Sequence, residues 1–313
     1  MPSLKMGSKD VSDAYLGATP VSAIYKGSTL LWSRSVTPSR IFTRSQLSST
    51  TLSSPSRAVF ISPAGNMFAT DWSSRCVKIF DSTGTYVRSF TPLSGKIPYG
   101  INGDATYLYV TYWDSPKIYK YQYSGTDVPT LKSTWTTSHQ YNDGTDVYNG
   151  YLYVACAYDH VIMKIDVSSG AVTEIATGMT YSLNDLAIDK VNSRIVTTQN
   201  GGENNGTKGH IIIYDMSGNL LVDKEMNGTY ASKMDSPQGV VVDASGYIYL
   251  GGAYTSTGSY NQGFMVMDKD LNILHDLTQS ECPTFCYTFN YDSYHNRVVW
   301  IGTSSPYIYG IDL

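Results

Sequence analysis

The chain has 313 residues and a formal net charge of −4, with acidic and basic residues interspersed. This pattern excludes the basic surface of a nucleic-acid-binding protein, and no apolar run approaches the roughly 18 residues that a membrane-spanning helix needs. Tyrosine is abundant, with 27 copies, and strong helix formers are scarce. The composition therefore predicts an all-β fold.

The first part of the chain carries a short repeat with a period of ten residues, in which Tyr-x-Gly-x-Thr begins at Tyr15 and again at Tyr25. We expect two short strands around turns, with Tyr15, Tyr25 and Trp32 as apolar anchors. A unit this small cannot hold a hydrophobic core alone, so it would pack on the rest of the chain, on its own copy or on another protein. Residues 1–38 are predicted to be an anchoring or oligomerisation segment; a flexible leader is the alternative.

A longer pattern of about forty to fifty residues recurs six times from residue 56 to the end. Each copy has a first strand after a turn, a β-rich second strand and a third strand that often ends in Asp. The last copy stops one strand short, and an orphan strand precedes the first copy. A repeated sheet whose first strand completes its last unit is typical of a closed ring. We predict a six-bladed β-propeller over residues 39–313, in which residues 40–46 complete the last blade.

Two segments resemble known families. Residues 236–243 (Ser-Pro-Gln-Gly-Val-Val-Val-Asp) and 246–250 (Gly-Tyr-Ile-Tyr-Leu) resemble the blades of NHL-type six-bladed propellers. That resemblance concerns the fold, because propellers serve binding, scaffolding and catalysis alike. Residues 5–12 and 15–32 look like the short N-terminal module of virion proteins in tailed bacteriophages of actinobacteria, where it precedes varied C-terminal domains in minor tail and other structural proteins. This second resemblance implies that the segment docks on a particle and that the propeller is displayed outward.

Polar residues near the first strands are candidates for a site at the mouth of a central channel: Asn142, Asp143, Asn184, Asp185, Asn290 and Asp292. The alternative is that they only cap turns. Residues 183–189 are similar to a segment of gluconolactonase-like propellers, and this similarity implies that Asn184 helps to bind a divalent cation. The matching turn at residues 236–239 has no Asn, however, and none of the four glutamates lies in a first strand. No cofactor is therefore predicted, and Asn184 is a weak metal candidate.

Two long insertions, at residues 199–209 and 251–263, separate the second and third strands of the fourth and fifth copies, so both should leave the same face of the ring. Tyrosine among small polar residues combines rigid apolar area with adaptable hydrogen bonds. The predicted rim, which would suit glycans, consists of Tyr112, Trp113, Tyr158, Tyr254 and Tyr260. Loop variability without function is the alternative.

Four cysteines are present. Cys76 and Cys156 lie in strand-like segments of different copies, and we expect buried free thiols there. Cys282 and Cys286 are close enough in sequence for a local disulfide or a ligand pair. No second Cys/His pair at zinc-like spacing accompanies them, so a zinc site is not predicted.

The resemblance to bacteriophage modules implies a virion structural protein, with a minor tail protein favoured. We expect it to have no enzymatic activity and to display its propeller for host-surface or glycan recognition. One alternative is a head decoration or purely structural virion protein, and another is a lactonase-like or glycan-cleaving propeller enzyme. The expected partners are other virion proteins, bound through the N-terminal segment, and a glycan or protein of the host cell envelope. A homo-oligomer is compatible with this interpretation. The expected location is the virion, assembled in the host bacterial cytoplasm.

Overall fold

The structure is a computed structural model that divides into two units, Met1–Ile41 and Phe42–Leu313. The residues that it describes are 5–6, 9–10, 14–16, 19–21, 23–26, 29–33, 44–48, 52, 57–140, 142–177, 182–199, 208–228, 234, 236–254, 261–277, 288–302 and 307–313. Within these ranges the ordered elements are β-strands, and none is a helix that could cross a membrane. The predicted all-β class is confirmed.

The first unit consists of three short hairpins. β1 (Lys5–Met6) pairs with β2 (Lys9–Asp10), β3 (Ala14–Leu16) with β4 (Thr19–Val21), and β5 (Ala23–Lys26) with β6 (Thr29–Ser33). The second and third hairpins contain the two copies of the ten-residue repeat. Tyr15, Tyr25 and Trp32 lie in β3, β5 and β6, but their side chains are outside the described part of the structure. Their anchoring role stays a prediction.

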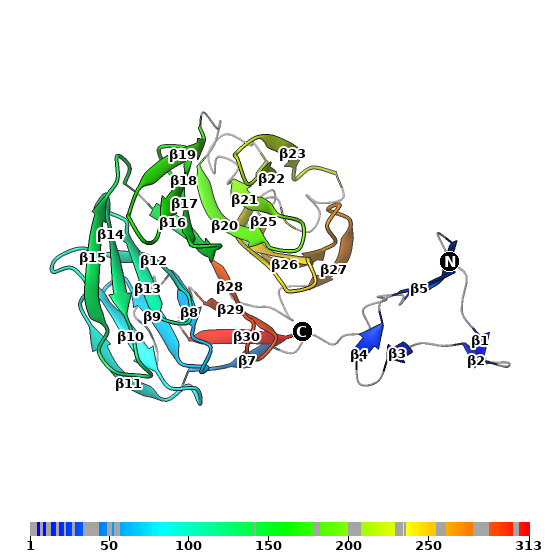
Figure 1. The fold of residues 1–313 in the computed structure, drawn as a ribbon, viewed down its shortest axis with the longest axis horizontal. Helices are drawn as coiled ribbons and strands as arrows, with labels where there is room; N and C mark the ends of the chain where they lie inside the picture. Colours follow the sequence, from blue (N-terminus) through cyan, green and yellow to red (C-terminus); the bar gives the residue numbers. More distant parts are fainter. Residues whose placement is uncertain are drawn as a thin grey trace. The chain divides into compact units, whose positions relative to one another are not determined.

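The second unit is a six-bladed β-propeller, in which six four-stranded antiparallel sheets follow one another around a ring (Figure 1). The innermost strands of blades one to six are β8 (Val59–Ile61), β12 (Pro98–Gly103), β16 (Asn142–Tyr148), β20 (Leu183–Asp189), β24 (Ser236–Val242) and β28 (Phe289–Asp292). The second strands are β9 (Met67–Asp71), β13 (Tyr107–Tyr112), β17 (Tyr151–Cys156), β21 (Arg194–Gln199), β25 (Ile248–Tyr254) and β29 (Arg297–Ile301). The third strands are β10 (Cys76–Phe80), β14 (Lys117–Gln122), β18 (Val161–Asp166), β22 (His210–Asp215), β26 (Asn261–Met267) and β30 (Ile308–Asp312).

The outermost strands of blades one to five are β11 (Tyr86–Phe90), β15 (Thr130–Thr136), β19 (Val172–Ala176), β23 (Leu220–Glu225) and β27 (Ile273–Leu277). Blade six takes its outermost strand from the start of this unit, because β30 pairs with β7 (Arg44–Gln46). The backbone N–H of Leu47 also donates to the Ile308 carbonyl over 2.7 Å, and the Ile308 N–H donates to Ser48 Oγ over 3.0 Å. The predicted closure is confirmed, with the strand beginning at Arg44; residues 40–43 lie outside the described residues.

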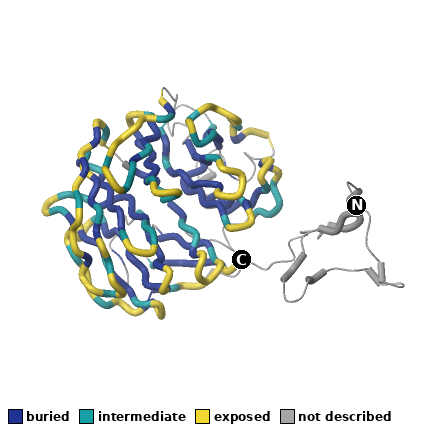
Figure 2. Tube along the Cα trace, viewed as in Figure 1, coloured by how far each residue is buried: buried dark blue, intermediate teal, exposed yellow. Residues whose placement is uncertain are grey.

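The hydrophobic core lies between neighbouring blades, where the aliphatic and aromatic side chains of the second and third strands are buried, while the outermost strands face solvent (Figure 2). Tight turns fix the outer hairpins. Asp81, for example, accepts the N–H groups of Thr83 and Thr85 over 2.9 and 3.0 Å. Gly84 has a φ of +84°, and a Cβ there would lie 1.6 Å from the Leu47 carbonyl oxygen, so only glycine fits. Cys76 and Cys156 are buried thiols that form no disulfide, as predicted.

The six innermost strands surround a central axis and are joined directly by side chains. Asn102 Nδ2 of β12 donates to the Thr145 carbonyl of β16 over 2.6 Å, and Asn184 Nδ2 of β20 donates to the Pro237 carbonyl of β24 over 3.3 Å. Because every blade repeats the same topology, the innermost strands all begin at one end of this axis and finish at the other. We call these the starting end and the finishing end.

Candidate functional site

The innermost strands of blades two to five are irregular at the starting end. Their pairing registers shift between Pro98 and Ile101, Asn142 and Thr145, Leu183 and Asp185, and Pro237 and Gly239. A bulge re-aims side chains and is common beside functional sites. The residue at the bulge is Tyr99 in blade two, Asp143 in blade three, Asn184 in blade four and Gln238 in blade five. Arg57 holds the equivalent position in blade one. We call these five residues the entrance ring.

Asp143 is the chemically unusual member of the entrance ring. It is only 7 % exposed, and within the described part of the structure its Oδ1 atom has no hydrogen-bond partner. Burial raises the pKa of Asp143 to about 8, although the Arg57 charge and a hydrogen bond from Tyr99 oppose the shift. A buried carboxyl that keeps its proton near neutral pH can act as a general acid.

Arg57 is held by aromatic rings beside Asp143. Its guanidinium carbon lies 4.8 Å from the centre of the Tyr99 ring and 5.4 Å from that of Trp72. Cation–π contacts of this kind fix the orientation of an arginine and stabilise its charge. The entrance ring thus brings a cation, a phenol and a carboxyl with a raised pKa into one cluster.

Asp185 occupies the position next to the entrance ring, where the other blades have Ala58, Gly100, Gly144, Gly239 and Thr288. Its carboxylate accepts backbone N–H groups from the equivalent residues of three blades: Leu186 at 2.9 Å, Val240 at 3.0 Å and Phe289 at 3.2 Å. A Cβ on Gly144 would lie 2.3 Å from Asp185 Oδ1, so only glycine leaves room for this carboxylate. Burial raises the pKa of Asp185, the three N–H donors oppose the shift, and the nearby Asp143 adds to it. Asp185 therefore connects the innermost strands of blades four, five and six.

The residues present do not fit the divalent-cation site implied for Asn184. Asn184 Nδ2 donates to the Pro237 carbonyl over 3.3 Å, and Gln238 Nε2 donates to Ser236 Oγ over 3.2 Å. Among the residues with described placement, no three His, Cys, Asp or Glu side chains converge on one point. We therefore assign no metal-dependent step to this site.

Aromatic residues extend from the entrance ring across the turns after the second strands of blades one to three. Tyr99 and Trp113 have ring centres 5.0 Å apart, Trp72 lies 5.4 Å from Tyr99, and Tyr158 lies 5.4 Å from Trp113. Tyr158 is 57 % exposed, whereas Trp72 and Trp113 are half-buried. We call Trp72, Tyr99, Trp113 and Tyr158 the aromatic track.

The predicted rim is only partly reproduced. Trp113 and Tyr158 do lie together, but Tyr112 is fully buried and stacks edge-on against Tyr119 with ring centres 5.5 Å apart. It is the last residue of β13, where alternation turns its side chain into the core between blades, so it cannot belong to a surface rim. The side chain of Tyr254 and the whole of Tyr260 lie outside the described residues. The second insertion is shorter than predicted, because β25 and β26 pair as far as Tyr254 and Asn261.

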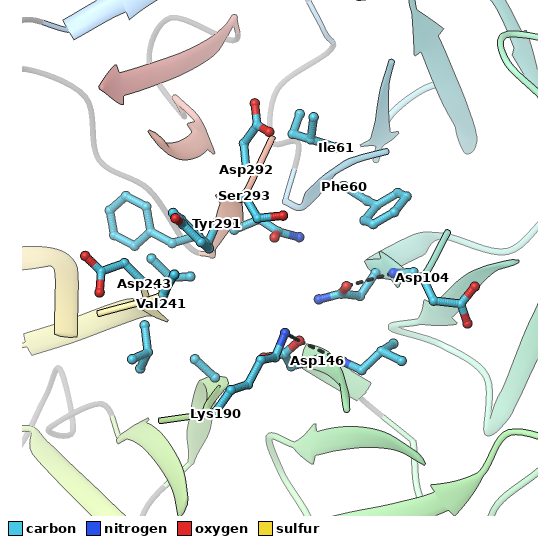
Figure 3. Close-up of a pocket in the computed structure, with 18 of the residues that line it drawn as sticks. Phe60, Ile61, Asp104, Asp146, Lys190, Val241, Asp243, Tyr291, Asp292 and Ser293 are labelled. Carbon is cyan, nitrogen blue, oxygen red and sulfur yellow. Dashed lines mark hydrogen bonds and ion pairs between the residues drawn. The ribbon is translucent and has the colours of Figure 1, made fainter. Parts of the chain in front are cut away.

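The finishing end holds a cavity of about 510 Å³, lined by all six innermost strands and the turns that follow them (Figure 3). Its lining includes Leu186, Val240 and Phe289, the three residues whose N–H groups bind Asp185. Asp185 therefore separates this cavity from the entrance ring. The predicted candidates Asn290 and Asp292 line the cavity, so the structure divides the sequence-predicted group between the two ends.

The carboxylates at the finishing end form hydrogen bonds that stabilise the turns there. Asp292 accepts Arg297 Nε over 2.8 Å and His295 Nδ1 over 2.7 Å, as well as two backbone N–H groups of its own turn. Asp104 and Asp243 cap their turns in the same way and accept a tyrosine hydroxyl. The carboxylates of all three point away from the middle of the opening (Figure 3). The turn-capping alternative is thus correct for Asp292, whereas Asp143 caps no turn.

Sequence reasoning missed Arg57, Tyr99, Gln238 and Trp72. A signal for them exists in the repeat. The first three precede the small residue of each innermost strand, at the position where Asp143 and Asn184 stand. Trp72 follows the second strand of blade one, as Trp113 does in blade two. Superimposing the copies position by position, instead of searching for acidic residues, would have found all four.

No protein-family model and no curated protein matches the chain, but its fold is shared with solved structures. A luciferin-regenerating enzyme matches with a TM-score of 0.64 at 8 % identity, covering 87 % of this chain and 95 % of the other. A gluconolactonase from Xanthomonas campestris matches with 0.63 at 14 % identity, covering 86 % and 89 %. An inactive virginiamycin B lyase from Staphylococcus aureus, solved with quinupristin, matches with 0.59 at 12 % identity, covering 87 % and 99 %.

At such low identities these similarities establish the fold. They also speak against the prediction that the chain is not an enzyme, because the three structures named above are propeller enzymes. Nothing in the comparisons supports the resemblance of residues 5–32 to a bacteriophage module. The chain is a six-bladed β-propeller, a fold that it shares with these three enzymes.

Proposed function

We propose that the chain is a propeller enzyme that cleaves a carbon–oxygen bond, in a lactone or a glycoside, at the entrance ring. The observation that carries the proposal is Asp143, a buried carboxyl with an unpartnered oxygen within the described part of the structure and a pKa raised to about 8. An unsatisfied buried polar atom in an otherwise well-bonded structure calls for an explanation, and a substrate that completes its hydrogen bonds supplies one.

In the proposed reaction, protonated Asp143 donates its proton to the leaving oxygen as the carbon–oxygen bond breaks. A water molecule adds to the carbon, and the carboxylate of Asp143 takes up the proton that the water releases, so the enzyme returns to its first state. The positive charge of Arg57 stabilises the carboxylate form of Asp143 between the transfer of its proton to the leaving oxygen and its reprotonation. The hydroxyl of Tyr99, which donates to Asp143, holds the carboxyl in place.

The test is turnover of a panel of lactones, including glucono-δ-lactone, and of soluble oligosaccharides by the full chain. Asp143→Asn should lower the rate by about 10²- to 10⁴-fold while the protein still melts cooperatively. Asp292→Asn is the matched control, since this carboxyl is equally buried but lies at the finishing end, and it should leave the rate unchanged. No turnover in the panel, or full activity in Asp143→Asn, would overturn the proposal.

We propose separately that residues 1–38 attach the enzyme to a larger assembly. The ten-residue repeat and the division of the chain into two units favour this role. The assembly that the residue pattern suggests is a bacteriophage particle, with a tail position preferred to a head position and the propeller directed at the envelope of a host bacterium. Sedimentation of the full chain and of residues 39–313 tests the attachment. The full chain should self-associate or bind particles, and equal behaviour of both chains would refute the role.

A further inference from the structure

We infer that the substrate is a saccharide built from pyranose rings with equatorial hydroxyls, and that it reaches the entrance ring along the aromatic track. This inference rests on the proposed function, because it names the substrate class of the same site. Tyr99 connects the two features: its hydroxyl donates to Asp143, and its ring lies 5.0 Å from that of Trp113.

The exposed end of the aromatic track can receive sugar rings on Trp113 and on Tyr158, whose ring planes are 77° apart. The members of the aromatic track come from successive blades and lead from a buried residue to an exposed one, since Tyr99 is 2 % exposed and Tyr158 is 57 % exposed. A pyranose with equatorial hydroxyls presents axial C–H groups on both faces, and these pack against an aromatic ring while the hydroxyls point sideways. The exposed end of the aromatic track would receive the outer sugars, and its buried end would place one glycosidic oxygen near Asp143.

Hydrogen-bonding groups flank the aromatic track where sideways hydroxyls would lie. Lys96 Nζ and Asp114 Oδ2 are 3.4 Å apart beside Trp113, with side chains 42 % and 34 % exposed. Asp159 follows Tyr158 directly and accepts from His139 Nδ1 over 3.0 Å, and its side chain is 41 % exposed. A sugar has apolar C–H faces and polar hydroxyls at its edge. Exposed hydrogen-bond donors and acceptors beside an aromatic ring can bind both.

A cationic ligand fits less well, because Arg57 already lies over the rings of Trp72 and Tyr99. A second cation on the same rings would be repelled by the guanidinium and would gain little from π contacts that are already made. A neutral ligand with an apolar face and many hydroxyls meets no such repulsion. The aromatic track therefore favours a sugar over an organic ammonium ion.

Calorimetric titration with cellotetraose and chitotetraose tests the inference in the Asp143→Asn background, which separates binding from turnover. Either sugar should bind, whereas sorbitol at the same concentration should not. Trp113→Ala should weaken binding by about 3- to 10-fold, Tyr158→Ala by less, and Trp113→Phe should retain most of the affinity. Tyr294→Ala is the matched control, since Tyr294 is 64 % exposed at the finishing end, and it should change nothing.

Two results would overturn the inference: neither sugar binds more tightly than sorbitol, or Trp113→Ala and Trp113→Phe, both folded by their melting curves, bind as the parent does. These results differ from a failure of the proposed function. Sugar binding that depends on Trp113, without cleavage of any carbon–oxygen bond by the parent chain, would support the substrate class and refute the catalytic role of Asp143.

Discussion

The starting end and the finishing end of the central axis are built by the same six strands, yet they differ in how completely their polar side chains are hydrogen-bonded. At the finishing end, Asp104, Asp243 and Asp292 accept hydrogen bonds on both carboxylate oxygens. At the starting end, Asp143 Oδ1, Gln199 Nε2 and Tyr112 Oη have no partner among the described residues. Satisfied polar groups hold a fold together, whereas unsatisfied ones cost stability and are kept for another reason.

This difference shows that a large cavity does not by itself identify the reactive site of the protein. The finishing end has about 510 Å³ of space, but its carboxylates hold the turns that close each blade. The starting end has bulges at the entrance-ring positions of blades two to five. The stability of a propeller comes mainly from packing between blades, away from the axis.

The largest effect that would test this comparison is expected at Asp185, which separates the two ends. Asp185→Ala leaves the N–H groups of Leu186, Val240 and Phe289 buried without an acceptor, and should lower the free energy of unfolding by about 3–6 kcal/mol. Denaturant titration measures the loss. Asp185→Asn, which keeps one acceptor oxygen, should lose less. A loss below about 1 kcal/mol in Asp185→Ala would show that this carboxylate does not hold the axis together.

A smaller loss is expected at Asp292, and it should affect stability alone. Asp292→Asn removes the charge that pairs with Arg297 and His295, whose contacting nitrogens lie 2.8 and 2.7 Å away. The free energy of unfolding should fall by about 1–3 kcal/mol, while turnover and sugar binding stay at the parent values. If activity falls along with stability, the finishing end contributes to function and the contrast between the ends is wrong.

The sequence was sufficient for the ring but not for the site. The number of blades could be predicted because the strand period and the turn residues are properties of short stretches of sequence. The closure could be predicted because the last copy, near Ile308, lacks one strand and an orphan strand precedes the first copy. The site depends on which side chain a bulge directs to the axis, and this follows from pairing across two blades. Asp143 and Asp292 look alike in sequence, and only their partners distinguish a candidate acid from a turn cap.

A last test is a pH dependence of stability that belongs to Asp143. Its pKa is about 8 in the folded chain against an ordinary value of 3.8, so between these two pH values the folded state holds a proton that the unfolded state has lost. Stability from this group is complete below the ordinary value and falls as pH rises toward about 8. The slope for one such proton is about 1.4 kcal/mol per pH unit.

Denaturant titrations of the parent and of Asp143→Asn between about pH 5 and pH 7 measure this contribution, because the two proteins differ in this one side chain. The free energy of unfolding of the parent should decrease relative to that of the variant as the pH rises, since the Asn side chain releases no proton. Parallel curves would mean that Asp143 ionises normally in the folded chain. A parent that gains stability with rising pH would mean that its pKa is lowered. Either result would remove the reason for treating the starting end as the reactive one.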